Sequence, residues 1–235
     1  MPAVRIEEAI EEFRRGKFVI IADDEDRENE GDLCMAAEAV TPEAINFMAM
    51  YARGLICQPI IKERLDELQL PMMAKDNTAR LETGFTVSVD VKVGTTTGIS
   101  AHDRSETVRA LIDPKSQLSD FGIPGHLFPL RYVEGGVLVR SGQTEASVDL
   151  ARLAGMYPSA VICEIMKEDG SMARMPDLER FSAEHDICIA TVADLIGYRR
   201  QHEQLVQRVA EARLPTKYGE FRICSYRSDV DPDEH

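Results

Sequence analysis

The sequence predicts an α/β fold in which helices cover a mixed β-sheet. Short apolar runs alternate with helix-like segments along the chain, and this alternation favours a layered sheet. The run AVICEIM (160–166) is apolar almost throughout, which is typical of a strand buried on both faces. The glycine turn at 134–136 predicts a hairpin over 126–140, and such a hairpin would make the sheet mixed rather than parallel.

Each element is predicted from its spacing of apolar residues and its end signals. Ile6, Ala9, Ile10 and Phe13 recur at helical spacing, and Thr41 followed by a proline is a helix start. The predicted helices cover 6–13, 43–53, 62–70, 105–112, 144–154, 175–186 and 193–213. The predicted strands cover 18–22, 33–40, 55–60, 85–91, 126–133, 137–140, 160–166 and 187–192.

Composition excludes several functions. The chain has 235 residues, enough for one large domain, and a net charge of -14. This charge argues against binding to nucleic acid or to an anionic membrane. No apolar run has the roughly 18 residues of a membrane span. Five cysteines without a CxxC pair predict reduced thiols, and hence a cytoplasmic protein.

The acidic segment DDEDRENEGD (23–32) is the first candidate site. A calcium-binding EF-hand loop starting at Asp26 would place Gly31 correctly, but its twelfth position is Ala37 instead of glutamate. A magnesium-type site fits better, because Mg²⁺ takes one or two carboxylates and completes its shell with water or substrate oxygens. Arg27 could then bind a substrate oxyanion or hold the neighbouring acids ionised. The simpler alternative is a solvated surface loop.

Two further segments precede predicted helices and could bind an anion. VGTTTGIS (93–100) offers hydroxyls and amides but lacks the lysine of a nucleotide-binding loop, so it could equally be a plain strand end. RSGQTEA (140–146) combines Arg140, the amides of 141–143 and the Thr144 hydroxyl, which together suit a phosphate. The alternative for the second segment is an ordinary helix cap made by Thr144.

Two single residues are candidates for acid/base chemistry. His126 lies where a strand begins, and a lone histidine there is more often structural than catalytic. Glu164 lies within the apolar run at 160–166, and a carboxylate in such surroundings is rare unless it is paired or functional.

Several ordered motifs closely resemble the 3,4-dihydroxy-2-butanone-4-phosphate synthase family of riboflavin biosynthesis over roughly residues 5 to 200. They are DDEDRENEGD, FTVSVDV, TTGISAHDR, PGHLFPLR, RSGQTEASVDLARLAG and ICEIMKEDGSMAR. The resemblance implies a three-layer α-β-α sandwich, a homodimer with active sites near the subunit interface, and dependence on Mg²⁺ or Mn²⁺. It also implies a lyase that converts the sugar phosphate D-ribulose 5-phosphate to L-3,4-dihydroxy-2-butanone 4-phosphate and formate.

The resemblance assigns a role to each candidate residue. It implies that His126 and Glu164 are the essential acid/base residues and that Glu28 ligates the metal. The substrate contacts that it implies are Arg27, Glu28, Asp32, Arg140, Ser141, Gly142, Gln143, Thr144 and Glu164. Repeated proton transfers need groups that titrate near neutrality, which explains a histidine and a carboxylate together.

The sequence departs from the family pattern at two positions. Gln143 stands where a metal-ligating histidine is common, and Ile123 stands where arginine is frequent. The glutamine carbonyl is an oxygen donor compatible with Mg²⁺ but carries no charge. We therefore expect an active enzyme with Gln143 as an altered metal ligand. The alternatives are a weakened paralogue, a regulatory dimer that binds phosphosugar, and a sugar-phosphate isomerase or aldolase.

The C-terminal segment differs from the rest of the chain. It resembles the opening of a GTP cyclohydrolase II domain as it follows the synthase in bifunctional enzymes. We therefore expect a synthase domain over 1–203, followed by a linker and a truncated cyclohydrolase-like segment over 204–235. No zinc-binding cysteine cluster is present, so cyclohydrolase activity is not expected.

Overall fold

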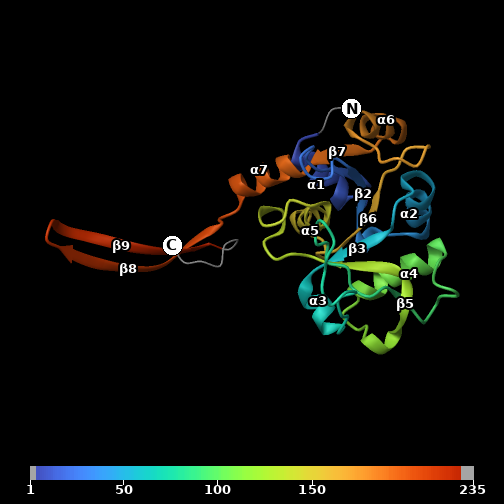
Figure 1. The fold of residues 1–235 in the computed structure, drawn as a ribbon, viewed down its shortest axis with the longest axis horizontal. Coiled ribbons are helices and arrows are strands. Elements are labelled where there is room, and N and C mark those ends of the chain that lie inside the picture. The colour runs from blue at the N-terminus through green and yellow to red at the C-terminus, as the bar shows by residue number, and fades with distance from the viewer. Residues whose placement is uncertain (1–3, 229–235) are drawn as a thin grey trace.

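Seven strands form one mixed sheet with helices on both faces (Figure 1). The structure is a computed structural model that describes residues 4–228. The strand order across the sheet is β4, β5, β3, β6, β2, β1, β7. The bounds are β1 Val19–Ala22, β2 Gly31–Ala36, β3 Cys57–Ile60, β4 Val89–Val91, β5 Phe121–Arg131, β6 Ala160–Glu164 and β7 Cys188–Thr191. The predicted α/β fold is confirmed.

The sheet separates two hydrophobic cores, which gives the predicted three layers. Successive side chains of a strand point to opposite faces, so Ile20 belongs to one core while Val19 and Ile21 belong to the other. The core with Ile20 packs against α2 (Pro42–Phe47), α3 (Lys62–Glu67), α4 (Ala101–Ile112) and α6 (Met175–His185). The other core packs against α1 (Ile6–Arg14), α5 (Gln143–Leu153) and α7 (Val192–His202).

Side-chain caps fix where three of the helices begin. Thr41, Ser100 and Thr191 each accept a hydrogen bond from a backbone N–H in the first turn of α2, α4 and α7. The helix predicted at 43–53 is confirmed as α2 followed by one π-helical turn, η2 (Met48–Ala52). The helix predicted from 105 begins earlier, at Ala101, because Ser100 caps it.

Strand pairing brings the two ends of the acidic segment to the middle of the sheet. β2 pairs antiparallel with both β1 and β6, whereas β1 and β7 are parallel. Asp32 on β2 lies directly opposite Glu164 on β6. The loop between β1 and β2 therefore emerges beside Glu164, although about 130 residues separate the two segments in the sequence.

The hairpin predicted over 126–140 is wrong in its second half. β5 ends at Arg131, and the next residues form a short 3-10 turn, η4 (Gly136–Leu138). The Val137 N–H donates to the buried carboxylate of Asp149 instead of to a strand. That carboxylate also accepts hydrogen bonds from Tyr132 and Arg199, so the polar network takes the place of strand pairing.

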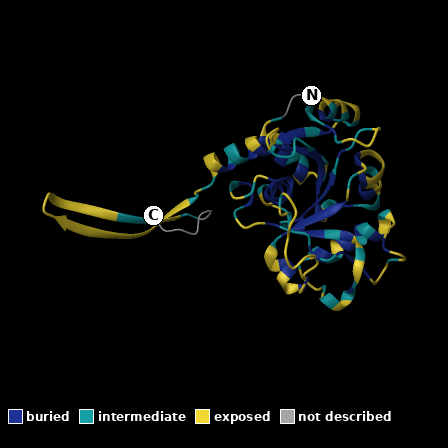
Figure 2. Ribbon diagram, viewed as in Figure 1, coloured by how far each residue is buried: buried dark blue, intermediate teal, exposed yellow. Residues whose placement is uncertain are grey.

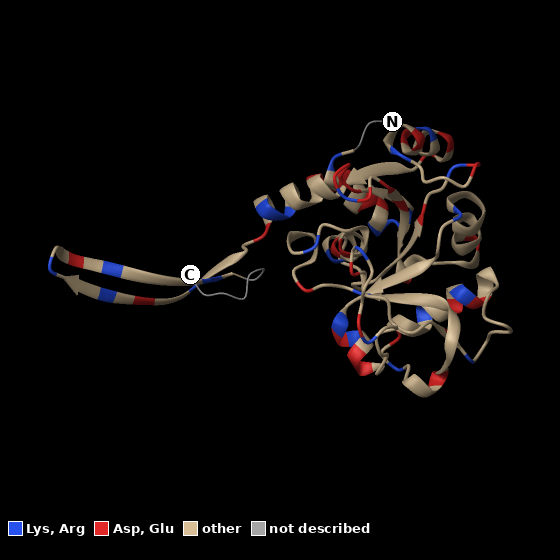
Figure 3. Ribbon diagram, viewed as in Figure 1, with Lys and Arg blue, Asp and Glu red and all other residues tan. Residues whose placement is uncertain are grey.

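The helix predicted over 193–213 is also wrong beyond its first half. α7 ends at His202, and β8 (Val206–Thr216) then pairs with β9 (Gly219–Ser228) in a separate two-stranded hairpin. The hairpin extends away from the sheet, and most of its residues are exposed (Figure 2). Basic and acidic residues occur on both of its strands (Figure 3), and Arg208 and Arg222 each form an ion pair with Glu211. The acidic residues at the end of the sequence, in the range 229–235, lie outside the described residues. Within the described part, no helix is long and apolar enough to cross a membrane.

Candidate active site

Asp23 folds the acidic segment into a compact loop. Its buried carboxylate accepts hydrogen bonds from the backbone N–H of Glu28 at 3.2 Å and of Glu30 at 2.9 Å. Asn29 adopts a left-handed backbone with φ of 55°, which lets the chain turn back into β2. The loop is therefore organised from within, and the alternative of a solvated charge block is not supported. In the sequence, Asp23 is marked only by its position directly after a buried run.

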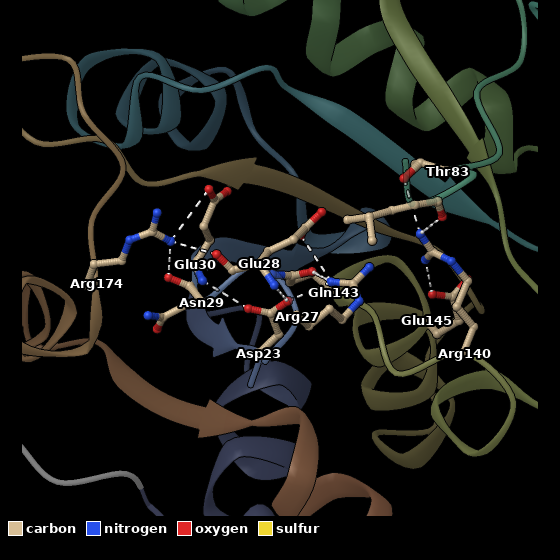
Figure 4. Close-up of polar contacts among 11 residues, drawn as sticks. Asp23, Arg27, Glu28, Asn29, Glu30, Thr83, Arg140, Gln143, Glu145 and Arg174 are labelled. Carbon is tan, nitrogen blue, oxygen red and sulfur yellow. Dashed lines mark hydrogen bonds and ion pairs between the residues drawn. The ribbon is translucent and has the colours of Figure 1, made fainter. Parts of the chain in front are cut away.

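The guanidinium of Arg27 lies at the centre of this loop (Figure 4). Its Nη1 donates to Asp23 Oδ2 at 2.7 Å, to Glu28 Oε2 at 3.1 Å and to Gln143 Oε1 at 2.7 Å. One cationic nitrogen thus joins the acidic loop to the start of α5. The arginine partly neutralises a cluster of carboxylates that would otherwise repel one another.

Arg174 holds the loop from its other side (Figure 4). This residue precedes α6, and its Nη1 donates to the carbonyl oxygens of Glu28, at 2.7 Å, and of Asn29. It also lies 3.7 Å from the Glu30 carboxylate. Arg174 carries no local signal in the sequence, because its contacts are to the backbone of a segment far away in the chain.

Asp32 and Glu164 place two carboxylates side by side on neighbouring strands. Burial raises the pKa of the Asp32 carboxyl well above its usual range, and the nearby charge of Glu164 raises it further. Burial and the charge of Glu28 also raise the pKa of Glu30. The sequence had suggested Glu164 as the buried carboxylate, but β6 ends at that residue and its side chain is partly exposed. Its Oε2 accepts a hydrogen bond from the Leu55 N–H at 2.8 Å.

Arg140 and the start of α5 form the opposite side of the site. Arg140 Nη1 donates to Glu145 at 2.5 Å, while its Nη2 donates to the Leu81 carbonyl and to the Thr83 hydroxyl, each at 3.1 Å. The capping residue of α5 is Gly142, and no side chain caps the helix. The interpretation of Thr144 as the helix cap is therefore wrong. The first N–H groups of α5 have no side-chain cap, as an anion-binding helix start requires.

One cavity of about 110 Å³ joins these groups. Seven of the predicted site residues line it: Arg27, Glu28, Asp32, Arg140, Gln143, Thr144 and Glu164. The remaining lining residues are Glu30, Cys57, Thr83, Phe85, Leu130 and Ile162. Of the other predicted residues, Ser141 and Gly142 do not line the cavity. Gly142 nevertheless packs so closely that a Cβ there would lie 2.6 Å from Arg140 Nη1 and 2.8 Å from Arg27 Nη2.

His126 does not line this cavity. It lies on β5, four residues before Leu130, which is about 13 Å along a strand. Its backbone N–H and its Nδ1 both contact the carboxylate of Asp90, and 44% of its side chain is exposed. Within one chain, the two predicted acid/base residues are therefore not part of one pocket.

A larger cavity of about 670 Å³ lies on the other face of the sheet, between η2 and α6. Its lining includes Tyr51, Arg53, Phe181 and His185, and none of the predicted site residues. This cavity is the larger of the two, but the smaller one contains the clustered charged residues and is therefore the better candidate for the active site.

The predicted metal ligands Glu28 and Gln143 lie close together, because both contact the same Arg27 nitrogen. Among the described residues, no three His, Cys, Asp or Glu side chains form a group that could hold a metal ion. Mg²⁺ does not need such a group, since two oxygen donors with water and substrate oxygens suffice. The Gln143 Nε2 is buried and has no hydrogen-bond partner, so a hydrogen bond holds only the oxygen of this side-chain amide. The donor set therefore fits Mg²⁺, provided that Arg27 releases these oxygens.

The fold and the pocket define an α/β protein whose clustered carboxylates face two arginines and an uncapped helix start. The comparisons with known proteins agree with this description. The family model of 3,4-dihydroxy-2-butanone 4-phosphate synthase matches residues 7–198. This match covers most of the chain, so the protein belongs to the 3,4-dihydroxy-2-butanone 4-phosphate synthase family.

Two curated relatives cover nearly the whole chain. The riboflavin biosynthesis protein RibBA of Aquifex aeolicus is 58% identical over 97% of this chain and 57% of its own length. The 3,4-dihydroxy-2-butanone 4-phosphate synthase of Pseudomonas aeruginosa is 54% identical over 98% of this chain and 63% of its own length. The chain thus spans about three fifths of the length of these relatives.

Solved structures confirm the fold. RibBX, a two-domain 3,4-dihydroxy-2-butanone 4-phosphate synthase from A. baumannii, matches with a TM-score of 0.90 and 48% identity. The match covers 98% of this chain and 68% of that one. A 3,4-dihydroxy-2-butanone 4-phosphate synthase in complex with two magnesium ions matches with a TM-score of 0.81 and 43% identity, over 85% of this chain and 98% of that one.

Proposed function

We propose that the protein converts D-ribulose 5-phosphate to L-3,4-dihydroxy-2-butanone 4-phosphate and formate. The observation that carries this proposal is the gathering of seven predicted residues around one cavity from three separate parts of the chain. The cavity combines carboxylates for proton transfer with two arginines for an anionic substrate. Its volume of about 110 Å³ is below the several hundred Å³ of typical ligand pockets. Substrate entry should therefore release the arginine contacts that cross it.

The side chains suggest a division of roles. Arg140 and the uncapped start of α5, from Ser141 to Thr144, would hold the phosphate, and Arg140 would then leave Glu145. Asp32 would donate and accept protons, because its raised pKa favours the protonated form. Glu164 would act with it as a base, held in position by the Leu55 N–H.

We propose Glu28 and Gln143 as the protein ligands of a divalent cation, Mg²⁺ or Mn²⁺. When bound, the cation would polarise substrate oxygens and stabilise an enediolate. The two magnesium ions of the related synthase support a divalent cation. Arg27 would move from these ligands to the substrate, as its contacts with both of them allow.

We also propose that the protein acts as a homodimer with its active sites near the subunit interface. The main support is His126, which is exposed and lies outside the cavity of its own chain. A second chain could bring such a histidine to a site. The net charge of -14 supports the further expectation that neither nucleic acid nor membrane is a partner. Free thiols at all five cysteines support a reducing compartment such as the cytoplasm.

For the domain organisation, we propose a synthase domain over 1–203 and a separate segment over 204–235. The exposed hairpin β8–β9 supports this division, since it adds little to either core. Removing 204–235 should leave the melting temperature of the α/β body within about 2 °C, because that body keeps its buried contacts. A drop above 10 °C in a calorimetric scan would count against the boundary.

The test of the activity is formate release from ribulose 5-phosphate with Mg²⁺. We expect turnover in the wild type, and a loss of about 10²- to 10⁴-fold in kcat for Glu164→Gln. The control is Glu168→Gln, which changes an exposed glutamate nearby and should keep full activity. No formate from the folded wild type would overturn the proposal.

The alternative of a weakened paralogue or a regulatory phosphosugar-binding dimer is not favoured. Relatives with 54% to 58% identity carry synthase or riboflavin-biosynthesis names. Gln143 retains an oxygen donor at the family's metal position. An isomerase or aldolase would consume the same substrate without releasing formate, so the assay also separates this possibility.

A further inference from the structure

Of the sequence motifs, FTVSVDV contributes only Phe85 to the proposed cavity and TTGISAHDR contributes no residue. Both motifs meet at Asp90, which contacts His126. Asp90 comes from the first motif, on β4, and Gly98 comes from the second. The contacts of these two residues explain why the three segments are brought together.

The carboxylate of Asp90 contacts His126 through both of its oxygens. Its Oδ1 accepts a hydrogen bond from the backbone N–H of His126 at 2.8 Å, and its Oδ2 lies 2.7 Å from the ring Nδ1. The backbone is fixed one residue earlier as well, since the Gly125 N–H donates to the Ser88 carbonyl at 3.0 Å. The His126 side chain is partly exposed to solvent, while these hydrogen bonds fix its backbone and its ring Nδ1.

The carboxylate of Asp90 has its own support. A Cβ at Gly98 would lie 2.0 Å from Asp90 Oδ2, so only glycine leaves room for the carboxylate there. The loop that carries Gly98 is held by Asp103, whose Oδ2 accepts from the Gly98 N–H at 3.0 Å and from the Thr96 hydroxyl at 2.9 Å. These contacts account for Thr96 and Gly98 in the segment 93–100 without a bound anion.

We propose that Asp90 is a positioning residue that fixes the tautomer and the direction of the His126 ring. An ionised carboxylate can only accept hydrogen bonds, so the Nδ1 facing it must carry the proton. The Nε2 is then the unprotonated nitrogen of the neutral ring, free to accept a proton from substrate. This inference rests on the proposed function, in which His126 is an acid/base residue.

Ring ¹⁵N NMR of histidine-labelled protein tests the proposal directly, with the His126 signals assigned from a His126→Asn sample. In the wild type we expect neutral His126 as the Nδ1–H tautomer. In Asp90→Asn the side-chain oxygen can still accept from the backbone N–H, but the amide then donates to Nδ1. The tautomer should therefore change to Nε2–H. The matched control is Asp66→Asn. It removes the carboxylate that pairs with Arg131, which lies on the same strand as His126, and it should leave the His126 signals unchanged.

The kinetic readout is kcat for formate release. We expect Asp90→Asn to lower kcat by about 10²- to 10⁴-fold while KM changes by less than about 3-fold, because the substrate contacts remain. Gly98→Ala should disturb the same tautomer, because its Cβ would displace the Asp90 carboxylate. The proposal is overturned if wild-type His126 is the Nε2–H tautomer, or if a folded Asp90→Asn keeps wild-type kcat.

The two proposals fail in different ways. Suppose that the wild type releases no formate, that its His126 is the Nδ1–H tautomer, and that Asp90→Asn changes this tautomer. The proposed function is then wrong, but the proposal that Asp90 positions His126 stands. If Asp90→Asn does not fold, the tautomer of the wild type alone decides.

Discussion

Arg27 is the residue whose removal best tests the organisation of the acidic loop. Only 16% of its side chain is exposed, and its partner Asp23 is fully buried. In Arg27→Ala, the Asp23 carboxylate would lose its cation but keep two backbone donors, and Gln143 would lose its one hydrogen-bond partner at Oε1. Breaking a buried ion pair costs about 3–5 kcal/mol when nothing replaces the partner. Because the backbone donors remain, we expect a loss of about 2–3 kcal/mol in the free energy of unfolding.

The assay is thermal unfolding in EDTA and again in 10 mM Mg²⁺. Without metal, Arg27→Ala should melt about 4–12 °C below the wild type, at roughly 2–4 °C for each kcal/mol. With metal, the deficit should shrink, because the proposed cation would compete with the guanidinium for the oxygens of Glu28 and Gln143. A cation present at 100 times its Kd stabilises by about 2.7 kcal/mol.

The matched control is Arg15→Ala, which removes an exposed arginine paired with Glu11 and Glu12 of α1. We expect it to cost less than about 1 kcal/mol and to respond to Mg²⁺ as the wild type does. The reasoning is refuted if Arg27→Ala is as stable as the wild type in EDTA. It is also refuted if Mg²⁺ stabilises both proteins equally.

Three further predictions concern other parts of the site and its support. Gln143→Ala should weaken Mg²⁺ binding, measured by calorimetry, by about 10-fold or more, while Gln143→His should bind at least as tightly as the wild type. Asp32→Asn should raise the melting temperature near pH 7 in EDTA. The folded pKa of Asp32 is raised, so between about 3.9 and that raised value the folded state holds the proton more tightly and stability falls as pH rises. The wild-type melting temperature should therefore decline with pH in this window more steeply than that of Asp32→Asn, and parallel curves would contradict the assignment. Arg199→Ala should cost about 3–5 kcal/mol in urea unfolding, because it leaves buried Asp149 without its cation, yet KM for the substrate should not change; a loss below 1 kcal/mol would show that the network is not structural.

Much of the fold follows from local patterns in the sequence. The runs at 18–22 and 160–166 are apolar enough to be recognised as buried strands, and both form as β1 and β6. Caps such as Thr41 act within one turn of their helix, so they are visible in the sequence. The strands predicted over 85–91 and 33–40 form only in part, as β4 (Val89–Val91) and as β2, which ends at Ala36. The two larger failures, at 137–140 and 206–213, have a common cause. Both segments have ambiguous patterns, and distant partners decide their conformation: Asp149 for the first and β9 for the second.

The candidate site was predicted less completely than the fold. Seven proposed residues gather at one cavity, as the motif order suggested. The supporting roles of three residues that act through tertiary contacts were not predicted from the sequence. These residues are Asp23, Asp90 and Arg174. Asp23 is marked only by its position directly after a buried run, and the partners of Asp90 and Arg174 lie on other segments of the chain.

The sequence by itself determined the layered α/β fold, the family, and the types of chemical group that the site contains. These features depend on periodicity and on ordered motifs, which are properties of short segments. Only the tertiary structure decided how those groups are paired. Arg27 is hydrogen-bonded to Gln143, and Asp32 lies opposite Glu164 at a buried position that raises the pKa of Asp32. His126 contacts Asp90 outside the cavity. These pairings depend on strand register and on burial, and neither quantity can be obtained from a short segment, because both are set by contacts between residues far apart in the chain.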